Sequence, residues 1–145
     1  MGKKKIITKT SDSENIKSGV TIKKSSKKAR KVDLARIYIN ATYNNTFITV
    51  TDKQGNVLTW ASAGSVGFSG PKKATPFAAS KVVSIVSEKM KPFEIKDIEI
   101  YVKGIGSGRD SAIRSFANEG YNILLLKDVT PIPHNGPRPP KPRRV

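Results

Sequence analysis

Residues 35–61 read ARIYINATYNNTFITVTDKQGNVLTWA and decide the fold. From Ala35 to Ala41, small or apolar residues occupy every second position and polar or aromatic residues stand between them. This period of two is typical of a strand with one buried face and one exposed face. The runs 47–51 and 57–61 predict two more strands, and the links between the runs are short and rich in Asn, Gln and Gly. We therefore expect three strands joined as an antiparallel meander.

A helix is predicted directly after the meander. Thr75-Pro76 combines a helix N-cap residue with a proline at the first helical position. The following apolar residues form a stripe with helical spacing that ends at Met90, just before Pro92. We expect a helix over residues 76–90, preceded by an irregular loop over residues 63–73.

The second half of the chain predicts one more helix between two more strands. Residues 95–102 form a fourth strand, residues 104–108 form a glycine-rich loop, and residues 109–119 form a helix closed by Gly120 in a left-handed conformation. Residues 123–127 are almost wholly apolar, a pattern typical of a parallel strand covered on both faces.

The order of elements is therefore βββαβαβ, which defines one α/β domain. Its fold class is a single five-stranded mixed sheet with two crossover helices, over residues 32–130. Residues 1–31 are predicted to be a basic N-terminal extension that is disordered when free, and residues 131–145 a Pro/Arg-rich C-terminal arm.

Charge is concentrated in these two extensions. The chain of 145 residues carries 27 Lys and Arg against 11 Asp and Glu, a net charge of +16. Residues 1–31 hold 11 of the basic residues and 2 of the acids, and residues 131–145 hold 4 basic residues and no acid. Basic arms on a nearly balanced domain favour a polyanionic partner, and nucleic acid is the leading candidate.

The sequence excludes several other classes of protein. It contains no cysteine, so disulfides, thiolate zinc sites and cysteine nucleophiles are excluded. We expect no membrane association, because no long apolar run or signal segment is present. A cytoplasmic location follows, although an organelle-encoded protein would have the same features.

Catalytic groups are scarce. His134 is the only histidine, and the acids of the domain are not grouped in a metal-ligand pattern. The run Gly104-Ile-Gly-Ser-Gly108 has Arg109 where a dinucleotide fingerprint needs its last glycine, and no phosphate-binding loop of the Walker type is present. We predict that the protein is not an enzyme and uses no cofactor and no metal.

Two glycine-containing loops nevertheless precede the two predicted helices. Backbone amides at a helix N-terminus attract phosphate, and glycine permits its close approach. Lys72, Lys73 and Arg109 add positive charge at the same ends. We interpret both loops as phosphate-binding elements, with plain turns as the alternative.

Three strings carry a resemblance to a known family. They are GFSGPKKATPFAA at residues 67–79, VKGIGSGR at residues 102–109 and DVTPIPHNGPRPP at residues 128–140. Over residues 32–145 the chain resembles the S11 family of small-subunit ribosomal proteins. The resemblance implies a ribonuclease-H-like sheet without the nuclease's carboxylates, which bridges ribosomal RNA helices on the platform of the small subunit. It also implies proximity to messenger RNA and the Shine-Dalgarno cleft, and contact with ribosomal proteins seven and eighteen and initiation factor three.

Charge, loops and resemblance together select the candidate RNA-binding residues. These are Lys3, Lys4, Lys5, Lys23, Lys24, Lys27, Lys28, Arg30, Lys31, Asn44, Asn45, Ser65, Gly67, Gly70, Lys72, Lys73, Lys103, Gly104, Gly106, Gly108, Arg109, Arg114, His134, Asn135, Arg138, Lys141, Arg143 and Arg144. We interpret the protein as a structural constituent of the small ribosomal subunit.

Two other functions stay open at this point. A non-ribosomal nucleic-acid-packaging protein would share the charge distribution but not the three strings. A nuclease of ribonuclease-H-like fold would need several carboxylates converging on two metal ions, and only Asp52 stands at the end of a meander strand.

Asn135-Gly136 is the only Asn-Gly pair in the chain. The amide nitrogen of a glycine is unhindered, so it attacks the preceding asparagine side chain most easily and forms a succinimide that opens to isoaspartate. Proteins of the resembling family are reported to carry this residue at the matching position. We expect conversion at Asn135, with an ordinary Asn-Gly turn as the alternative.

Overall fold

The computed structural model describes residues 31–141. In chain order its elements are β1 (Leu34–Ala41), β2 (Thr46–Thr51), β3 (Val57–Ser62), the 3-10 helix η1 (Gly70–Ala74), α1 (Pro76–Met90), the 3-10 helix η2 (Lys91–Phe93), β4 (Asp97–Lys103), α2 (Gly108–Asn118) and β5 (Asn122–Asp128). The predicted order βββαβαβ is confirmed.

The five strands form one mixed sheet in the order β3-β2-β1-β4-β5. β2 is antiparallel to both β1 and β3, so the predicted meander is confirmed. β4 and β5 run parallel to β1, and the chain reaches each of them through one of the two α-helices. β1 is therefore the strand at which the antiparallel half and the parallel half of the sheet meet.

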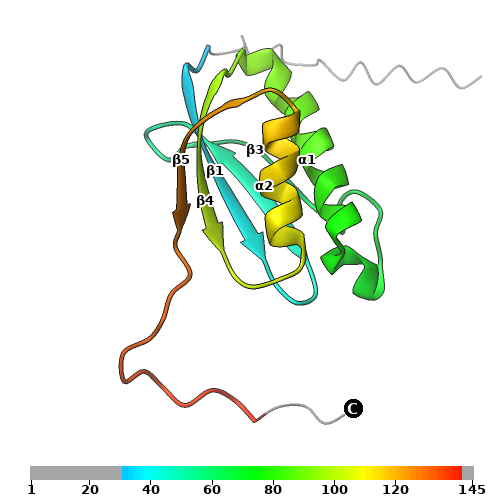
Figure 1. Cartoon of the computed structure of the whole chain (residues 1–145), viewed down its shortest axis with the longest axis vertical. Helices are drawn as coiled ribbons and strands as arrows, with labels where there is room; N and C mark the ends of the chain where they lie inside the picture. Colours follow the sequence, from blue (N-terminus) through cyan, green and yellow to red (C-terminus); the bar gives the residue numbers. More distant parts are fainter. Residues whose placement is uncertain (1–30, 142–145) are drawn as a thin grey trace, which may run out of the picture.

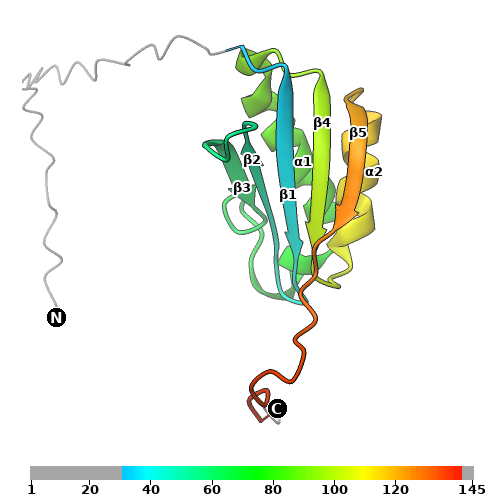
Figure 2. The ribbon, with the colours of Figure 1, turned by 90° about the vertical axis from the view of Figure 1, so that its left-hand side faces the viewer.

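Both α-helices cover the same face of the sheet (Figures 1 and 2). The alternation predicted for β1 is confirmed, because Ile37, Ile39 and Ala41 are buried while Tyr38 and Asn40 between them are exposed. The inward residues of β1, β2 and β4 pack against the apolar stripe of α1 and against Phe116 of α2. Burial of these apolar side chains between sheet and helices is the main contribution to stability.

The ends of α1 follow the local sequence signals. The Thr75 hydroxyl accepts a hydrogen bond from the N–H of Ala78 at 3.3 Å, and Pro76 occupies the first helical position. The helix ends at Met90, and Pro92 lies in η2 directly after it. The predicted bounds of α1 are confirmed at both ends.

Several other bounds differ slightly from their predictions. α2 begins and ends one residue earlier than expected, and Gly120 has the predicted left-handed backbone, with φ of +86°. β4 begins at Asp97 because Glu94 turns the chain with φ of +52°, which leaves the buried Ile95 outside the strand. The irregular loop before α1 contains one regular element, η1.

No helix of residues 31–141 lies over the other face of the sheet, and we call it the open face. Tyr38 and Tyr101 stack across β1 and β4 with ring centroids 5.2 Å apart. Arg36 donates to Glu99 at 3.0 Å, and the Tyr101 hydroxyl donates to the same carboxylate at 3.1 Å. Burial and this hydrogen bond raise the pKa of Tyr101. Side chains therefore tie the two central strands together on the face that the helices leave uncovered.

The prediction that β5 is covered on both faces is wrong. β5 is the edge strand of the sheet, and six of its seven residues are exposed. Only Ile123 packs partly against the core. The reason is that α1 lies mainly over β3 and β2 and α2 over β1, so parallel pairing to β4 does not bring cover with it. An apolar run can form a buried strand or an exposed edge, and in β5 it lies at the surface.

Because β1 is buried and β5 is exposed, shortening an apolar side chain should destabilise the fold much more in β1 than in β5. Ile37→Ala removes a side chain with 0% exposure from the central strand and should cost about 2–5 kcal/mol in the free energy of unfolding. Leu124→Ala, at a side chain that is 56% exposed, should cost under about 0.5 kcal/mol. Chemical denaturation measures both, and a large cost at Leu124 would show that β5 is covered in the free protein.

Candidate nucleic-acid interface

The predicted phosphate-binding loops lie at one end of the sheet, which we call the loop end. Because β1 and β4 are parallel, their carboxyl ends meet there, and both α1 and α2 begin there (Figure 2). Gly106 donates its N–H to the carbonyl of Ala41 at 2.9 Å, and the Ser107 hydroxyl donates to the carbonyl of Ala74 at 2.6 Å. The structure therefore brings together loops that lie about 30 residues apart in the chain.

The loop before α1 presents open backbone and charge. Gly67 and Gly70 have φ of +101° and +57°, and nothing lies within 4 Å of where their side chains would begin. Lys72 is exposed and Lys73 is half-buried, both within η1. This loop leaves its glycine backbone accessible beside two lysines, which is the arrangement that a phosphate contact needs.

The loop before α2 is built differently. A Cβ atom on Gly104 would overlap the carbonyl oxygen of Ala41, and one on Gly106 would overlap that of Thr42. A Cβ atom on Gly108 would overlap the hydroxyl of Thr46, and both Gly106 and Gly108 are buried. Tight packing against the end of β1 and the β1–β2 turn is therefore what requires glycine at these positions, and it needs no phosphate.

Arg109 is engaged within the protein. Its guanidinium donates to the Asp128 carboxylate at 2.9 Å and to the Gly104 carbonyl at 3.0 Å. A phosphate bound by Arg109, as the sequence predicts, would have to share its guanidinium with Asp128. In this arrangement Arg109 ties the start of α2 to the end of β5.

Thr130 completes this connection. Its hydroxyl donates to Asp128 at 2.6 Å and accepts the N–H of Gly104 at 3.1 Å, and its own N–H donates to Asp128 at 2.9 Å. The Thr130 hydroxyl, the Thr130 N–H and Arg109 together lower the pKa of the Asp128 carboxyl from 3.8 to about 2. The ionised carboxylate therefore fixes where the C-terminal arm leaves the domain.

Beyond Thr130 the arm extends from the loop end (Figures 1 and 2). All described residues from Pro131 to Lys141 are exposed and none belongs to a helix or strand. His134, Asn135, Arg138 and Lys141 are therefore all accessible, and Asn135 has φ of +50°. Prolines keep such a segment extended without internal hydrogen bonds.

The remaining predicted residues divide into three groups. Asn44, Asn45, Ser65 and Lys103 lie at the loop end, in the β1–β2 turn, after β3 and at the end of β4. Arg114 is exposed on α2, and Lys31 lies at the opposite end of the sheet, where it pairs with Glu94 at 2.8 Å. Lys3, Lys4, Lys5, Lys23, Lys24, Lys27, Lys28, Arg30, Arg143 and Arg144 lie outside the described residues.

Acidic residues are unevenly distributed along the sheet. Asp33, Asp52, Glu94 and Asp97 all lie at the end opposite the loop end, beside the start of β1 and of β4. At the loop end, the acids of the described chain are Asp110 at the start of α2 and Asp128, which is paired with Arg109. A polyanion therefore meets less repulsion at the loop end than at the opposite end.

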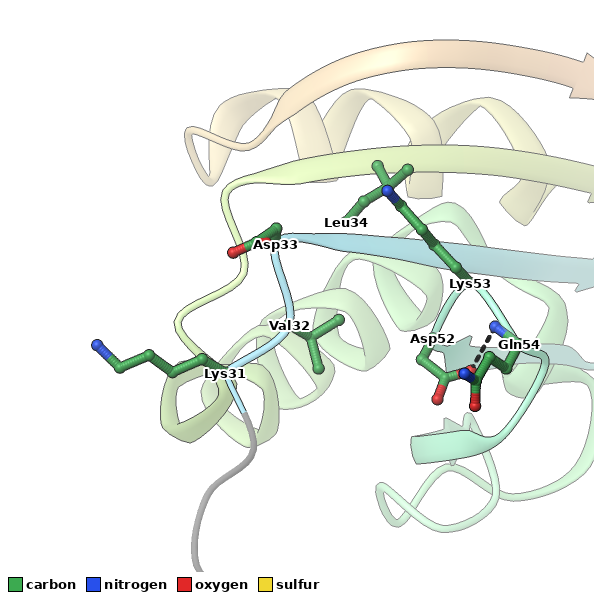
Figure 3. A pocket seen from close by; sticks show the side chains of 7 residues that line it. All are labelled: Lys31, Val32, Asp33, Leu34, Asp52, Lys53 and Gln54. Carbon is green, nitrogen blue, oxygen red and sulfur yellow. Dashed lines mark hydrogen bonds between the residues drawn. The ribbon is translucent and has the colours of Figure 1, made fainter.

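Figure 3 shows a shallow pocket at the opposite end, lined by residues 31–34 and 52–54. The Asp52 carboxylate accepts the N–H of Gln54 at 2.8 Å and the N–H of Asn56 at 2.9 Å, and the Asn56 side chain lowers its pKa most. Asp52 thus holds the β2–β3 turn. Within residues 31–141 no three His, Asp or Glu side chains gather as a metal site, so the nuclease alternative gains no support there.

Phe77 is an exposed ring at the loop end that the sequence did not single out. Phe77, at the start of α1, is 64% exposed, and the Lys81 ammonium lies 5.8 Å from its ring centroid. Phe68 contacts the same ring edge-on at 6.0 Å. Its position in the sequence could have indicated this exposure, because Phe77 lies in the first turn of α1 and outside the apolar stripe that faces the sheet.

Comparison with known proteins identifies the family. A profile described as ribosomal protein S11 matches residues 35–144. The chain belongs to the ribosomal protein S11 family. The small ribosomal subunit protein uS11 of a Nitratiruptor species is 57% identical over 122 residues, which cover 82% of this chain and 94% of that protein. The protein of the same name from Helicobacter pylori is 52% identical over 132 residues, which cover 89% and 98%.

Family membership confirms the resemblance that the three strings indicated. As an S11 protein, the chain is a structural constituent of the small ribosomal subunit and not an enzyme. RNA binding is a general property of this family, and ribosomal RNA and other ribosomal proteins are its partners. This assignment sets aside both the packaging and the nuclease alternatives. Among the helices of residues 31–141, none has the length and apolar character needed to cross a membrane.

The Thr130–Asp128 contact predicts a pH-dependent anchor for the arm. A depressed carboxyl pKa adds stability above pH 3.8 that is lost as the pH falls towards 2. Thr130→Val removes the hydroxyl donor, so the pKa of Asp128 should rise from about 2 towards 3.8. Carboxyl carbon NMR during an acid titration measures this shift. Thr49→Val, on the distant strand β2, should leave the Asp128 pKa unchanged, and an equal shift in both variants would contradict the assignment.

Proposed function

We propose that the loop end and the C-terminal arm bind phosphates of different ribosomal RNA helices and hold those helices together on the platform of the small subunit. The observation that carries this proposal is the convergence of Lys72, Lys73 and Lys103 with the start of the arm at one end of the sheet. The Asp128–Thr130 contact gives the arm a fixed origin, so its cations extend from the same place as the cations of η1. Two groups of cations on one rigid end suit two RNA segments.

The contacts are proposed to be mostly to the RNA backbone and its shape. Open backbone at Gly67 and Gly70 beside Lys72 and Lys73 suits a phosphate. The exposed ring of Phe77 offers a stacking surface to an unpaired base. The extended arm places Arg138 and Lys141 where they reach a second RNA segment.

The other predicted RNA-binding residues have supporting roles in this proposal. Asn44, Asn45 and Ser65 border the loop end, and Arg114 extends the basic surface along α2. Gly104, Gly106, Gly108 and Arg109 shape the loop end through their packing. The basic residues of 1–31 and 142–145, most of which lie outside the described residues, add positive charge for further phosphate contacts.

The family resemblance extends the proposal to the surroundings in the subunit. A position on the platform places the chain near messenger RNA and the Shine-Dalgarno cleft, with ribosomal proteins seven and eighteen as neighbours and initiation factor three as a transient partner. Because the relatives come from bacteria, we place the protein in cytoplasmic ribosomes.

Exchanging two lysines tests the RNA contact. Lys72→Ala with Lys73→Ala should weaken binding to small-subunit ribosomal RNA and reduce the dependence of log K on log salt by about 0.7–0.9 for each lost phosphate contact. The melting temperature should change little, because surface charges rarely stabilise the fold by more than about 0.5 kcal/mol. Binding isotherms at several salt concentrations give both quantities.

The matched control is Lys91→Ala with Lys96→Ala, two exposed lysines at the opposite end of the sheet. This pair removes the same net charge, so it should reduce RNA affinity much less. Equal losses in the two double variants would mean that net charge alone, and not the loop end, determines binding.

We further propose that Asn135 converts to isoaspartate. Asn135 is exposed in an irregular segment with φ of +50°, and Gly136 follows it. Within the described part of the arm, no regular hydrogen bonding holds the attacking nitrogen away. Peptide mass spectrometry with an isoaspartate-specific methyltransferase should detect the modified residue in mature subunits, and an unmodified Asn135 there would contradict the proposal.

A further inference from the structure

β5 presents an apolar surface that the RNA-binding proposal does not use. Leu124, Leu125 and Leu126 are 56%, 41% and 54% exposed. They are consecutive on the edge strand of the sheet, and the helices do not cover them. Contiguous exposed apolar residues on a soluble protein mark a site of interaction with another molecule.

The backbone at this edge is also available. Asn122 and Val129 donate their N–H groups towards β4, to the carbonyls of Lys96 at 3.0 Å and of Val102 at 2.8 Å. The register shifts between Ile98 and Glu99, which leaves Leu124 without a partner on β4, and regular pairing resumes at Leu125. Donors alternate along the regular part of the strand, so counting back from Val129 the N–H groups of Asp128 and Leu126 point away from β4. Edge strands of soluble proteins are usually protected by charge, proline or cover. From Asn122 to Leu126 there is neither charge nor proline.

The charge pattern indicates which molecule occupies this edge. RNA is bound through cations, and the five residues from Asn122 to Leu126 contain none in a chain of net charge +16. A second copy of the chain would carry the same +16 and repel the first. Leu125 lies beside Glu99 on the open face and Leu126 beside the buried Ile100 on the helix-covered face. An extended segment of a different protein with apolar residues on both of its faces therefore fits both the leucines and the free backbone groups. Lys127 at the end of the strand favours an acidic residue opposite it.

We infer that β5 pairs with an extended segment of a neighbouring protein of the small subunit, which adds a sixth strand to the sheet. On the open face, the cross-strand neighbours of Leu125 and Lys127 are Glu99 and Tyr101. Side chains of the added strand on that face therefore pack towards the stacked tyrosines of β1 and β4. The inference rests on membership of the small subunit and is independent of the RNA contacts proposed above.

Photo-crosslinking in assembled subunits tests the inference. The photoreactive residue p-benzoylphenylalanine replaces Leu124 in the full-length chain, and Val57, exposed on the opposite edge strand β3, receives the same replacement as a matched control. Position 124 should give a ribonuclease-resistant product with one different ribosomal protein, and position 57 should not give that product. A product with RNA, a product with a second copy, no product, or the same product from both positions would overturn the inference.

Backbone pairing is tested by a second change in the chain that carries the crosslinker. Leu126→Pro removes the outward N–H and keeps an apolar side chain, so the yield of the protein product should fall about tenfold. Leu126→Ala keeps the N–H and should retain most of the product. Equal yields in the two variants would overturn strand addition.

A third variant, Leu125→Lys, distinguishes a protein segment from RNA at the β5 edge without introducing a proline. The new ammonium group lies beside Glu99, so the fold should tolerate it, and the protein product should fall severalfold. An RNA product that increases instead would show that the edge binds RNA. The affinity of Leu126→Pro and of Leu125→Lys for ribosomal RNA is measured in parallel and should stay unchanged. Failure of the RNA proposal and failure of this inference are therefore distinguishable.

Discussion

No side chain fits at Gly104 or Gly106, where the loop before α2 packs against the end of β1, because Cβ atoms there would overlap the carbonyl oxygens of Ala41 and Thr42. This close approach lets Gly106 hydrogen-bond to Ala41 and fixes where α2 begins. It also brings Ser107 to the carbonyl of Ala74, which joins the starts of α1 and α2. The position of η1 and its lysines therefore depends on a packing constraint in a loop about 30 residues away.

The same constraint determines the position of the arm. Gly104 donates its N–H to Thr130, and Thr130 with Arg109 holds the Asp128 carboxylate in its ionised form. The tight loop thus adds to the β4–β5 pairing and to the Arg109–Asp128 ion pair in holding the end of β5 next to the start of α2. The proposed role of holding RNA segments together needs such a fixed origin, since flexible arms alone give affinity but no geometry.

The sheet presents different kinds of surface on its different sides. Helices cover one face, cations gather at the loop end, and β5 exposes leucines at one edge. In the free protein these leucines lose the benefit of burial, a cost that a component of a large assembly recovers when its neighbours dock. The exposed leucines of β5 and the basic loop end are therefore the features expected of a protein that is enclosed by other molecules in an assembly.

The sequence by itself determined the strands, the helices and their order. Alternation in β1, the Thr75-Pro76 cap and the Gly120 turn are local effects, because each depends on residues within a few positions. The sequence also determined the family, since the strings at 67–79, 102–109 and 128–140 need no structure to be compared. The tertiary structure alone decided that the second glycine loop serves packing, that Arg109 pairs with Asp128, and that β5 is an exposed edge. The physical reason is that burial, close approach and ion pairing depend on which distant segments lie alongside, and the local pattern contains no information about that neighbour.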